Sequence, residues 1–169
     1  MVWTIILFIL VLIDQLTKIA ARIYIGKQES IEIIENFFYL VNRVNRGAAW
    51  SFLANKSWGI YFLAIISFFA SILILFLIYK TPVLKIRIPL VMICAGSIGN
   101  LIDRVLYKGV TDFFDFHFGS YVFPTFNIAD SLIVCGSILF AIIIIADSSV
   151  LNEMPFLNEK IDSENSDGI

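Results

Sequence analysis

Two aspartates, Asp112 and Asp130, lie at the edges of long apolar segments of the sequence. Placing a carboxylate so close to hydrocarbon costs free energy, so such a residue is expected to be paired with another group or to have a function. Two carboxyls a few ångströms apart hold one proton between them, so that the ionised member can activate a water while the protonated member polarises a carbonyl. The pair therefore indicates aspartic-type peptide hydrolysis. Taken singly, either aspartate could instead cap a helix or a short loop element.

The composition places these aspartates in a membrane protein. The chain has 169 residues, of which 59% are hydrophobic and 15% charged, and its mean hydropathy is +0.89. Four segments are long and apolar enough to cross a bilayer, which takes about 20 residues of helix. These predicted spans cover residues 2–25, 59–79, 88–106 and 126–146. We expect a polytopic α-helical protein with one membrane domain over residues 1–150 and an acidic, solvated tail over 151–169.

Four spans bring the two aspartates to one side of the membrane. The loop before the second span and the loop before the fourth span must share one face, whereas both termini share the other. Asp112 follows the third span and Asp130 opens the fourth, so both lie at the same rim. The first loop ends in the segment Asn45–Trp50, which reaches that rim as well.

The charges alone leave the orientation of the chain open. Eight basic residues belong to the side that carries the aspartates and four to the other, and this count favours a cytoplasmic location for the aspartates. The only short and densely basic connection, Lys80–Arg87, lies on the opposite side and favours the reverse.

The loops also contain sequence typical of strands and of membrane interfaces. The segment Ser30–Val41 is rich in β-branched and aromatic residues with a polar break at Glu35 and Asn36, which predicts a small hairpin between the first two spans. In the loop before the fourth span, several aromatic residues are typical of an interfacial belt. These are Phe116, Phe118, Tyr121 and Phe123, with His117 among them.

Several further polar or small residues are candidates for supporting roles. Asp14 and Lys18 are four residues apart on one helix face and can neutralise each other. Asn100 and Asn127 can hold neighbouring groups in place where water is scarce. Arg104 could orient a substrate carbonyl or anchor the chain at the rim. The small residues Gly47-Ala48-Ala49 allow close approach of a substrate backbone or tight packing of the loop.

Other classes of function find little support. The sequence contains no metalloprotease, nucleophile-elbow or phosphate-loop motif. Cys94 and Cys135 fall within spans, where cysteine packs as a small hydrophobe, so we expect no disulfide and no metal site. The net charge of −2 indicates no nucleic-acid partner.

Read together, five phrases resemble the bacterial lipoprotein signal peptidases, also called signal peptidase II. They are Asp14-Gln15-x-x-Lys18, Asn45-x-Gly47-Ala48-Ala49, Gly99-Asn100-x-x-Asp103-Arg104, Val110-Thr111-Asp112-Phe113 and Phe126-Asn127-x-Ala129-Asp130. The resemblance covers nearly the whole chain except the tail. It implies an intramembrane aspartyl protease that removes the signal peptide of a prolipoprotein just before a cysteine carrying diacylglycerol. It also implies residence in the bacterial cytoplasmic membrane, cytoplasmic termini, and an extracytoplasmic β cradle and active site.

The resemblance also implies roles for individual residues. Asp112 and Asp130 take the catalytic positions, and Asp14 and Lys18 match a structural motif of the first helix. The residues expected to line or brace the substrate groove are Asn45, Gly47, Asn100, Asp103, Arg104, Asn127 and Ala129. The expected partners are lipidated prolipoproteins and membrane lipids, with no cofactor, and the chain is expected to act as a monomer.

Three alternatives stay open at this point. Asp103 could replace Asp112 in the pair, although its neighbour Arg104 makes an ion pair or a loop brace the simpler role. A proton-coupled small transporter or channel could use Asp14, Asp112 and Asp130 as a relay. A non-catalytic assembly subunit could use the small residues of the third span, Ala95, Gly96, Ser97 and Gly99, as a contact face.

Overall fold

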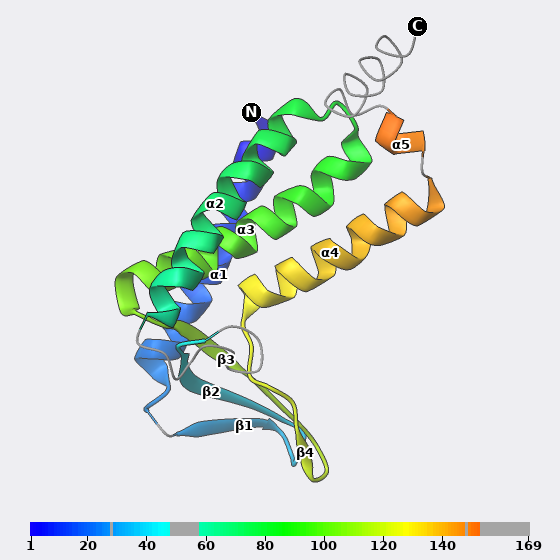
Figure 1. The fold of residues 1–169 in the computed structure, drawn as a ribbon. Helices are drawn as coiled ribbons and strands as arrows, with labels where there is room; N and C mark the ends of the chain where they lie inside the picture. The colour runs from blue at the N-terminus through cyan, green and yellow to red at the C-terminus, as the bar shows by residue number, and fades with distance from the viewer. Residues whose placement is uncertain (28, 48–57, 148, 153–169) are drawn as a thin grey trace, which may run out of the picture.

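Four long helices and a small sheet make up most of the described part of the chain (Figure 1). The computed structural model describes residues 1–27, 29–47, 58–147 and 149–152. The helices are α1 (Val2–Tyr24), α2 (Gly59–Lys80), α3 (Leu84–Tyr107) and α4 (Ile128–Ala146), followed by the short α5 (Ser149–Asn152). All four long helices are apolar enough to span a membrane, which confirms the predicted fold class. The largest difference from the predicted limits is the start of α3, at Leu84 instead of residue 88.

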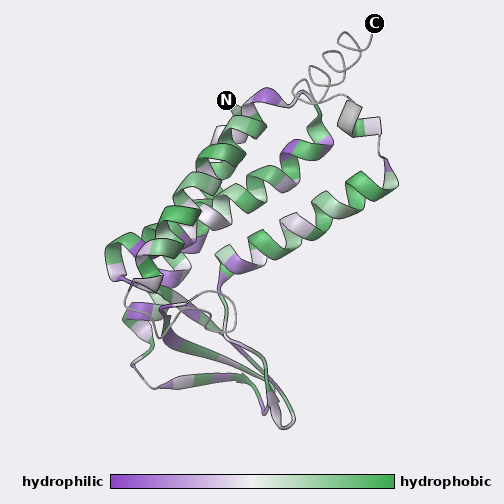
Figure 2. Cartoon of the chain, in the orientation of Figure 1, coloured by the Kyte–Doolittle hydropathy of each residue, from purple (hydrophilic) through white to green (hydrophobic). Residues whose placement is uncertain are grey.

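The helices carry their apolar side chains outward, as expected of segments in lipid. Hydrophobic residues run along all four helices in Figure 2. In α1 the buried residues are Asp14, Lys18 and Ala21, whereas Phe8, Leu12 and Leu16 lie exposed. This pattern is the inverse of a helix in a soluble protein, because lipid is a good solvent for apolar side chains and the polar groups must find partners inside the bundle.

Helix α3 is the central helix and packs against α1, α2 and α4. Its small residues Ala95, Gly96, Ser97 and Gly99 are all buried, which confirms that they form a helix-packing face. A Cβ atom at Gly96 would collide with the backbone oxygen of Ala129 on α4. A Cβ atom at Gly99 would collide with the carboxylate of Asp14 on α1. The two glycines therefore bring the first turn of α4 and the polar residues of α1 against α3.

The sheet has four antiparallel strands in the order β1 (Ser30–Ile34), β2 (Phe38–Asn45), β3 (Val110–Phe118) and β4 (Tyr121–Val122). The hairpin of β1 and β2 confirms the strand prediction for the first loop, and Asn36 takes the left-handed conformation at its turn, with φ of 56°. Strands β3 and β4 were not expected, because their aromatic residues suggested an interfacial belt. The ring of Phe116 stacks on that of Phe38, with centroids 4.6 Å apart. Phe118, Tyr121 and Phe123 are exposed, and their place in an interfacial belt stays a prediction.

The sheet lies at one end of the helices, and the start of α1 and α5 lie at the other (Figure 1). Strand β3 follows α3 directly and pairs with β2, so Arg43 is the cross-strand partner of Asp112. The sheet therefore joins the loop before α2 to the segment that carries Asp112. The predicted acidic tail lies outside the described residues from 153 onward.

Candidate active site

Asp112 and Asp130 reach one cavity from two elements. Asp112 is the third residue of β3, and Asp130 lies in the first turn of α4. The cavity has a volume of about 1120 Å³ and is bounded by α2, α3, α4 and the strands β2 and β3. Asp112 and Asp130 are the only acidic residues among the described residues that line it. The structure thus brings together two aspartates that are 18 positions apart in the sequence.

Asparagine side chains hold both carboxylates. Asn127 Nδ2 donates to Asp112 Oδ1 at 2.7 Å, and Asn45 Nδ2 donates to Asp112 Oδ2 at 3.2 Å. Asn100 Nδ2 donates to Asp130 Oδ1 at 2.7 Å, and the backbone N–H of Asn127 donates to Asp130 Oδ2 at 3.3 Å. The expectation that Asn100 and Asn127 hold neighbouring groups is confirmed. Asn127 contacts both carboxylates, so one residue sets their relative position.

Asn127 has a second task as the N-cap of α4. Its Oδ1 accepts from the backbone N–H of Asp130 at 3.0 Å, while Asp130 accepts from the N–H of Asn127. This reciprocal capping box satisfies backbone donors that a helix start leaves unpaired. Asp130 was considered as the N-cap of this helix, as an alternative to catalysis, but the N-cap is Asn127 and Asp130 takes part in the capping box as the third helical residue. The capping box leaves Asp130 on the cavity wall, so the two roles are compatible.

The surroundings of Asp112 favour its protonated form. Burial and, to a smaller extent, the negative charge of Asp130 raise the pKa of the Asp112 carboxyl to about 7. The hydrogen bonds from Asn127 and Asn45 stabilise the ionised form and act in the opposite direction. Near neutral pH the Asp112 carboxyl can therefore both hold and release a proton, which is the property that acid–base catalysis requires.

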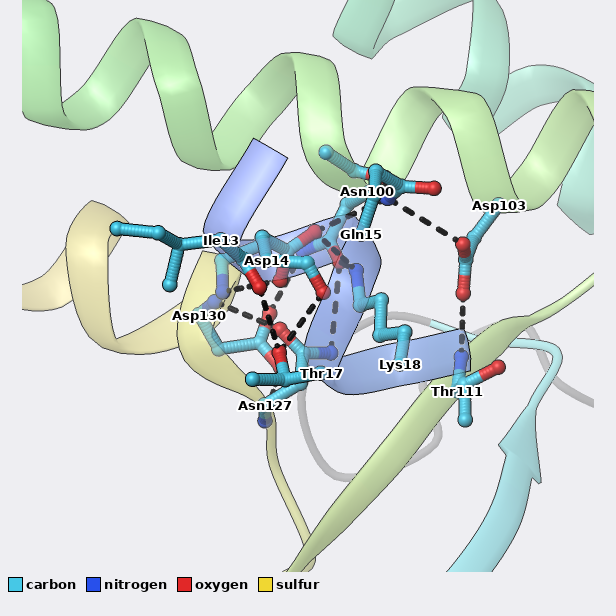
Figure 3. Close-up of polar contacts among 12 residues, drawn as sticks. Ile13, Asp14, Gln15, Thr17, Lys18, Asn100, Asp103, Thr111, Asn127 and Asp130 are labelled. Carbon is cyan, nitrogen blue, oxygen red and sulfur yellow. Dashed lines mark hydrogen bonds and ion pairs between the residues drawn. The ribbon is translucent and has the colours of Figure 1, made fainter. Parts of the chain in front are cut away.

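A buried ion pair on α1 contacts the residues next to Asp130 (Figure 3). Lys18 Nζ lies 2.9 Å from Asp14 Oδ2 and donates to Asn100 Oδ1 at 3.0 Å, and both charged side chains are 0% exposed. Asp14 Oδ1 accepts from the backbone N–H of Ala129 at 2.8 Å. The predicted neutralisation of Asp14 by Lys18 is confirmed. Lys18 thus holds Asn100, which donates to Asp130, and Asp14 holds Ala129, the residue directly before Asp130.

Asp103 braces the strand that carries Asp112. Its Oδ2 accepts from the backbone N–H of Thr111 at 2.9 Å and lies 3.3 Å from Nη1 of Arg22. Arg22 also donates to the hydroxyl of Thr111 at 2.7 Å. The brace predicted for Asp103 is therefore present, but its ionic partner is Arg22 and not the adjacent Arg104. Successive residues of a helix point in different directions, so Asp103 and Arg104 face different neighbours.

The remaining predicted residues lie around the same cavity. Arg104 lines it, and its Nη1 donates to the hydroxyl of Ser67 on α2 at 3.3 Å. Gly47 also lines it, and its backbone N–H donates to Asn45 Oδ1 at 2.9 Å. Ala129 is fully buried beside the pair, where its N–H contacts Asp14. The neighbours Ala48 and Ala49 lie outside the described residues.

The sequence reasoning missed Arg22 and Gln15 as parts of this network. Arg22 follows Lys18 by four residues, on the face that Asp14 and Lys18 share, so helical periodicity could have found it. Gln15 donates to Asp14 Oδ2 and to the backbone oxygen of Gly99, each at 3.1 Å. Among the described residues, no group of three or more histidine, cysteine, aspartate or glutamate side chains lies together as a metal site would require.

The arrangement also bears on the transporter alternative. A proton relay needs carboxylates spaced through the depth of the membrane. Asp14 instead contacts Ala129, the residue next to Asp130, and Asp112 shares Asn127 with Asp130. The three carboxylates therefore lie close to one level of the bundle.

Comparisons with known proteins agree with these observations. The family model for signal peptidase (SPase) II matches residues 6–146. A lipoprotein signal peptidase of Janthinobacterium sp. (strain Marseille) is 43% identical over 141 residues, which cover 82% of this chain and 84% of that protein. One from Clostridium acetobutylicum is 41% identical over 137 residues, covering 80% and 88%. A bacterial membrane enzyme structure obtained by the in meso method at 2.3 Å has a TM-score of 0.78 and 34% identity, covering 88% of this chain and 90% of that one. This chain belongs to the signal peptidase II family.

Proposed function

We propose that this chain is an intramembrane aspartic endopeptidase that cuts prolipoproteins just before the diacylglyceryl-modified cysteine, with Asp112 and Asp130 as its catalytic pair. The observation that carries the proposal is that a buried carboxylate, Asp112, and a partly buried one, Asp130, line one cavity and share Asn127 as a partner. Both carboxylates come from the same chain, so we infer that a monomer in the membrane lipid suffices. The chemistry uses side chains and water, and we propose no cofactor.

The two carboxyls would divide the acid and base work. The ionised carboxyl takes a proton from a water molecule, whose oxygen then adds to the carbon of the scissile carbonyl. The protonated carboxyl first donates a hydrogen bond to the oxygen of the tetrahedral intermediate. It then transfers its proton to the amide nitrogen, so that the C–N bond breaks and the amine leaves. The pair regains one proton from the water and is ready again. The shared proton belongs to the pair and not to either residue.

The surrounding residues would hold this chemistry in place. Asn45, Asn100 and Asn127 keep the carboxylates oriented through the bonds described above. Arg104 lines the cavity with a guanidinium that can donate to a substrate carbonyl. Gly47 leaves room for the substrate backbone. Four other residues do not contact the catalytic carboxylates but position the residues around them. These are Asp103, Ala129, Asp14 and Lys18.

The cavity also suits a membrane-embedded substrate. Beyond Asp130 and Ser131, the part of its wall on α4 is apolar and consists of Ile133, Val134 and Cys135, of which Cys135 is exposed. A signal peptide is an apolar helix that moves within the bilayer, so it can enter from the lipid and lie against this wall. The scissile bond then lies at the end of the helices, next to the sheet.

The proposed reaction can be tested with the purified protein and a diacylglyceryl-modified precursor in detergent micelles. We expect two products, the free signal peptide and a polypeptide that begins with the lipidated cysteine, which mass spectrometry identifies. An unmodified precursor of the same sequence serves as the control. Cleavage at another bond, or ion flux through reconstituted vesicles without cleavage, would contradict the proposal.

We also propose that the sheet and the cavity face the extracytoplasmic side, with both termini in the cytoplasm. The four spans and the location of the start of α1 and of α5, opposite the sheet, support a common side for the two ends of the chain. In a background without Cys94 and Cys135, Glu35→Cys at the hairpin turn should react with a membrane-impermeant maleimide in intact cells. Lys80→Cys at the end of α2 should react only after the membrane is opened. The reverse pattern would place the sheet in the cytoplasm.

The raised pKa of Asp112 predicts how the activity depends on pH. An acid with a pKa of about 7 keeps its proton below that pH and loses it above, and the pair needs one proton. We therefore expect kcat/KM to fall as the pH rises above about 7, approaching tenfold per pH unit. Asn45→Ala removes a donor that stabilises the ionised carboxylate, so the fall should move to higher pH. Identical midpoints in the wild type and Asn45→Ala would show that another group controls the profile.

A further inference from the structure

The cavity extends from the helices onto the end of strand β2, where two arginines line it. Arg43 and Arg46 flank Asn45, and both side chains are exposed. With Arg104, the described lining carries three positive charges. The catalytic pair supplies one negative charge when it shares a proton. The part of the cavity next to the sheet therefore attracts anions.

Arg43 is held at this location by the sheet. It is the cross-strand partner of Asp112, and such partners have Cβ atoms about 5 Å apart. Its Nη2 lies 3.1 Å from Oδ2 of Asp115, a side chain that is 3% exposed, whereas Arg43 itself is 55% exposed. His117 Nε2 contacts the same oxygen at 3.1 Å. Asp115 thus anchors the guanidinium of Arg43, which stays more than half exposed and lines the cavity.

The apolar wall on α4 and the charged end next to the sheet together indicate in which direction the substrate chain runs through the cavity. The apolar wall on α4 suits the signal helix, so the polypeptide beyond the scissile bond must leave past the sheet. An extended chain advances about 3.3 Å per residue. Side chains within about the first four residues after the cut would therefore pass Arg43 and Arg46. Among the described residues, no salt bridge joins Arg46 to an acidic side chain.

We propose that Arg43 and Arg46 make the enzyme select precursors with an acidic side chain within about the first four residues after the lipidated cysteine. The inference rests on the proposed function and adds a substrate preference to it. Both arginines are specificity residues here and take no part in bond cleavage. Because they contact the substrate through exposed ion pairs, each contributes modestly, about threefold in kcat/KM.

The test uses three lipidated precursors that differ at one residue, the second after the cysteine, which is aspartate, asparagine or lysine. For the wild type we expect kcat/KM to be about tenfold higher for the aspartate precursor than for the lysine precursor. In the double variant Arg43→Gln, Arg46→Gln this ratio should approach one. Arg46→Glu should lower it further than Arg46→Gln. Lys27→Glu, an equal charge change at an exposed residue outside the cavity lining, should leave the ratio unchanged.

The asparagine precursor separates this inference from the proposed function. If the wild type cleaves it, and cleaves the aspartate and lysine precursors equally well, the preference is refuted and the peptidase assignment stands. If no lipidated precursor is cleaved, both fail. A ratio that persists in the double variant also refutes the preference. A merely structural role of the arginines would lower the activity toward all three precursors and leave their ratio unchanged. Should Arg43→Gln fail to fold, Arg46→Gln alone gives the same comparison at about half the effect on a logarithmic scale.

Discussion

Asp112→Asn and Asp130→Asn should each lower the cleavage of a lipidated precursor by about a thousandfold or more, because a positioned acid or base contributes about 10²–10⁴ in rate and each substitution removes one member of the pair. An amide can neither accept the proton of the water nor return a proton to the amine. The double variant should be no less active than either single variant, since the two residues act as a unit. Single-turnover cleavage, followed by mass spectrometry, measures the effect.

A matched control is available on the same strand. Asp115 is also buried and lies three residues beyond Asp112, but it does not line the cavity. Asp115→Asn should cleave the neutral asparagine precursor within a few fold of the wild type. Full activity in Asp112→Asn would refute its place in the pair and return Asp103 to consideration.

Lys18→Met should lower the free energy of unfolding by about 3–5 kcal/mol, which is the usual cost of removing one partner of a buried ion pair. The lysine is fully buried, and its removal leaves the carboxylate of Asp14 without its cation. Asn100 also loses the donor that holds its Oδ1, while its Nδ2 still contacts Asp130. Unfolding in mixed micelles with increasing sodium dodecyl sulfate, followed by circular dichroism, measures the change.

A second substitution tests whether the unpaired charge is the cause. Asp14→Asn removes the charge and keeps an oxygen that can accept from the N–H of Ala129. The double variant Lys18→Met, Asp14→Asn should therefore be more stable than Lys18→Met alone, which a double-mutant cycle quantifies. The exposed Lys27→Met should change the stability by no more than about 0.5 kcal/mol. If Lys18→Met unfolds at the same detergent fraction as the wild type, the pair does not stabilise the bundle.

The membrane class, the four helices and the first hairpin could be predicted because each depends on neighbouring residues in the chain. An uncharged run such as residues 59–79 satisfies its backbone within one helix whatever surrounds it. The ion pair of Asp14 with Lys18 is equally local, since four residues make one helical turn. The aspartate pair itself followed from counting spans, which places Asp112 and Asp130 at one rim without any knowledge of packing.

Other features depend on how distant segments meet. Strand β3 could not be distinguished from an aromatic loop, because its pairing with β2 depends on a partner about 70 residues earlier in the chain. The partner of Asp103 was misjudged for the same reason. The nearest cation in the sequence is Arg104, but in the packed helices Asp103 of α3 contacts Arg22 of α1, which is 81 positions away.

By itself, the sequence determined which residues carry the chemistry and on which side of the bundle they gather, because residue type, helical period and the number of spans are properties of the chain alone. Only the tertiary structure decided which groups hold the two carboxylates, that Lys18 reaches Asp130 through Asn100, and that Arg43 lies opposite Asp112. These contacts depend on the approach that Gly96 and Gly99 allow between α1, α3 and α4, and on the register of β2 against β3. The helix approach and the strand register both arise from packing between segments far apart in the chain. A local sequence pattern cannot predict such packing.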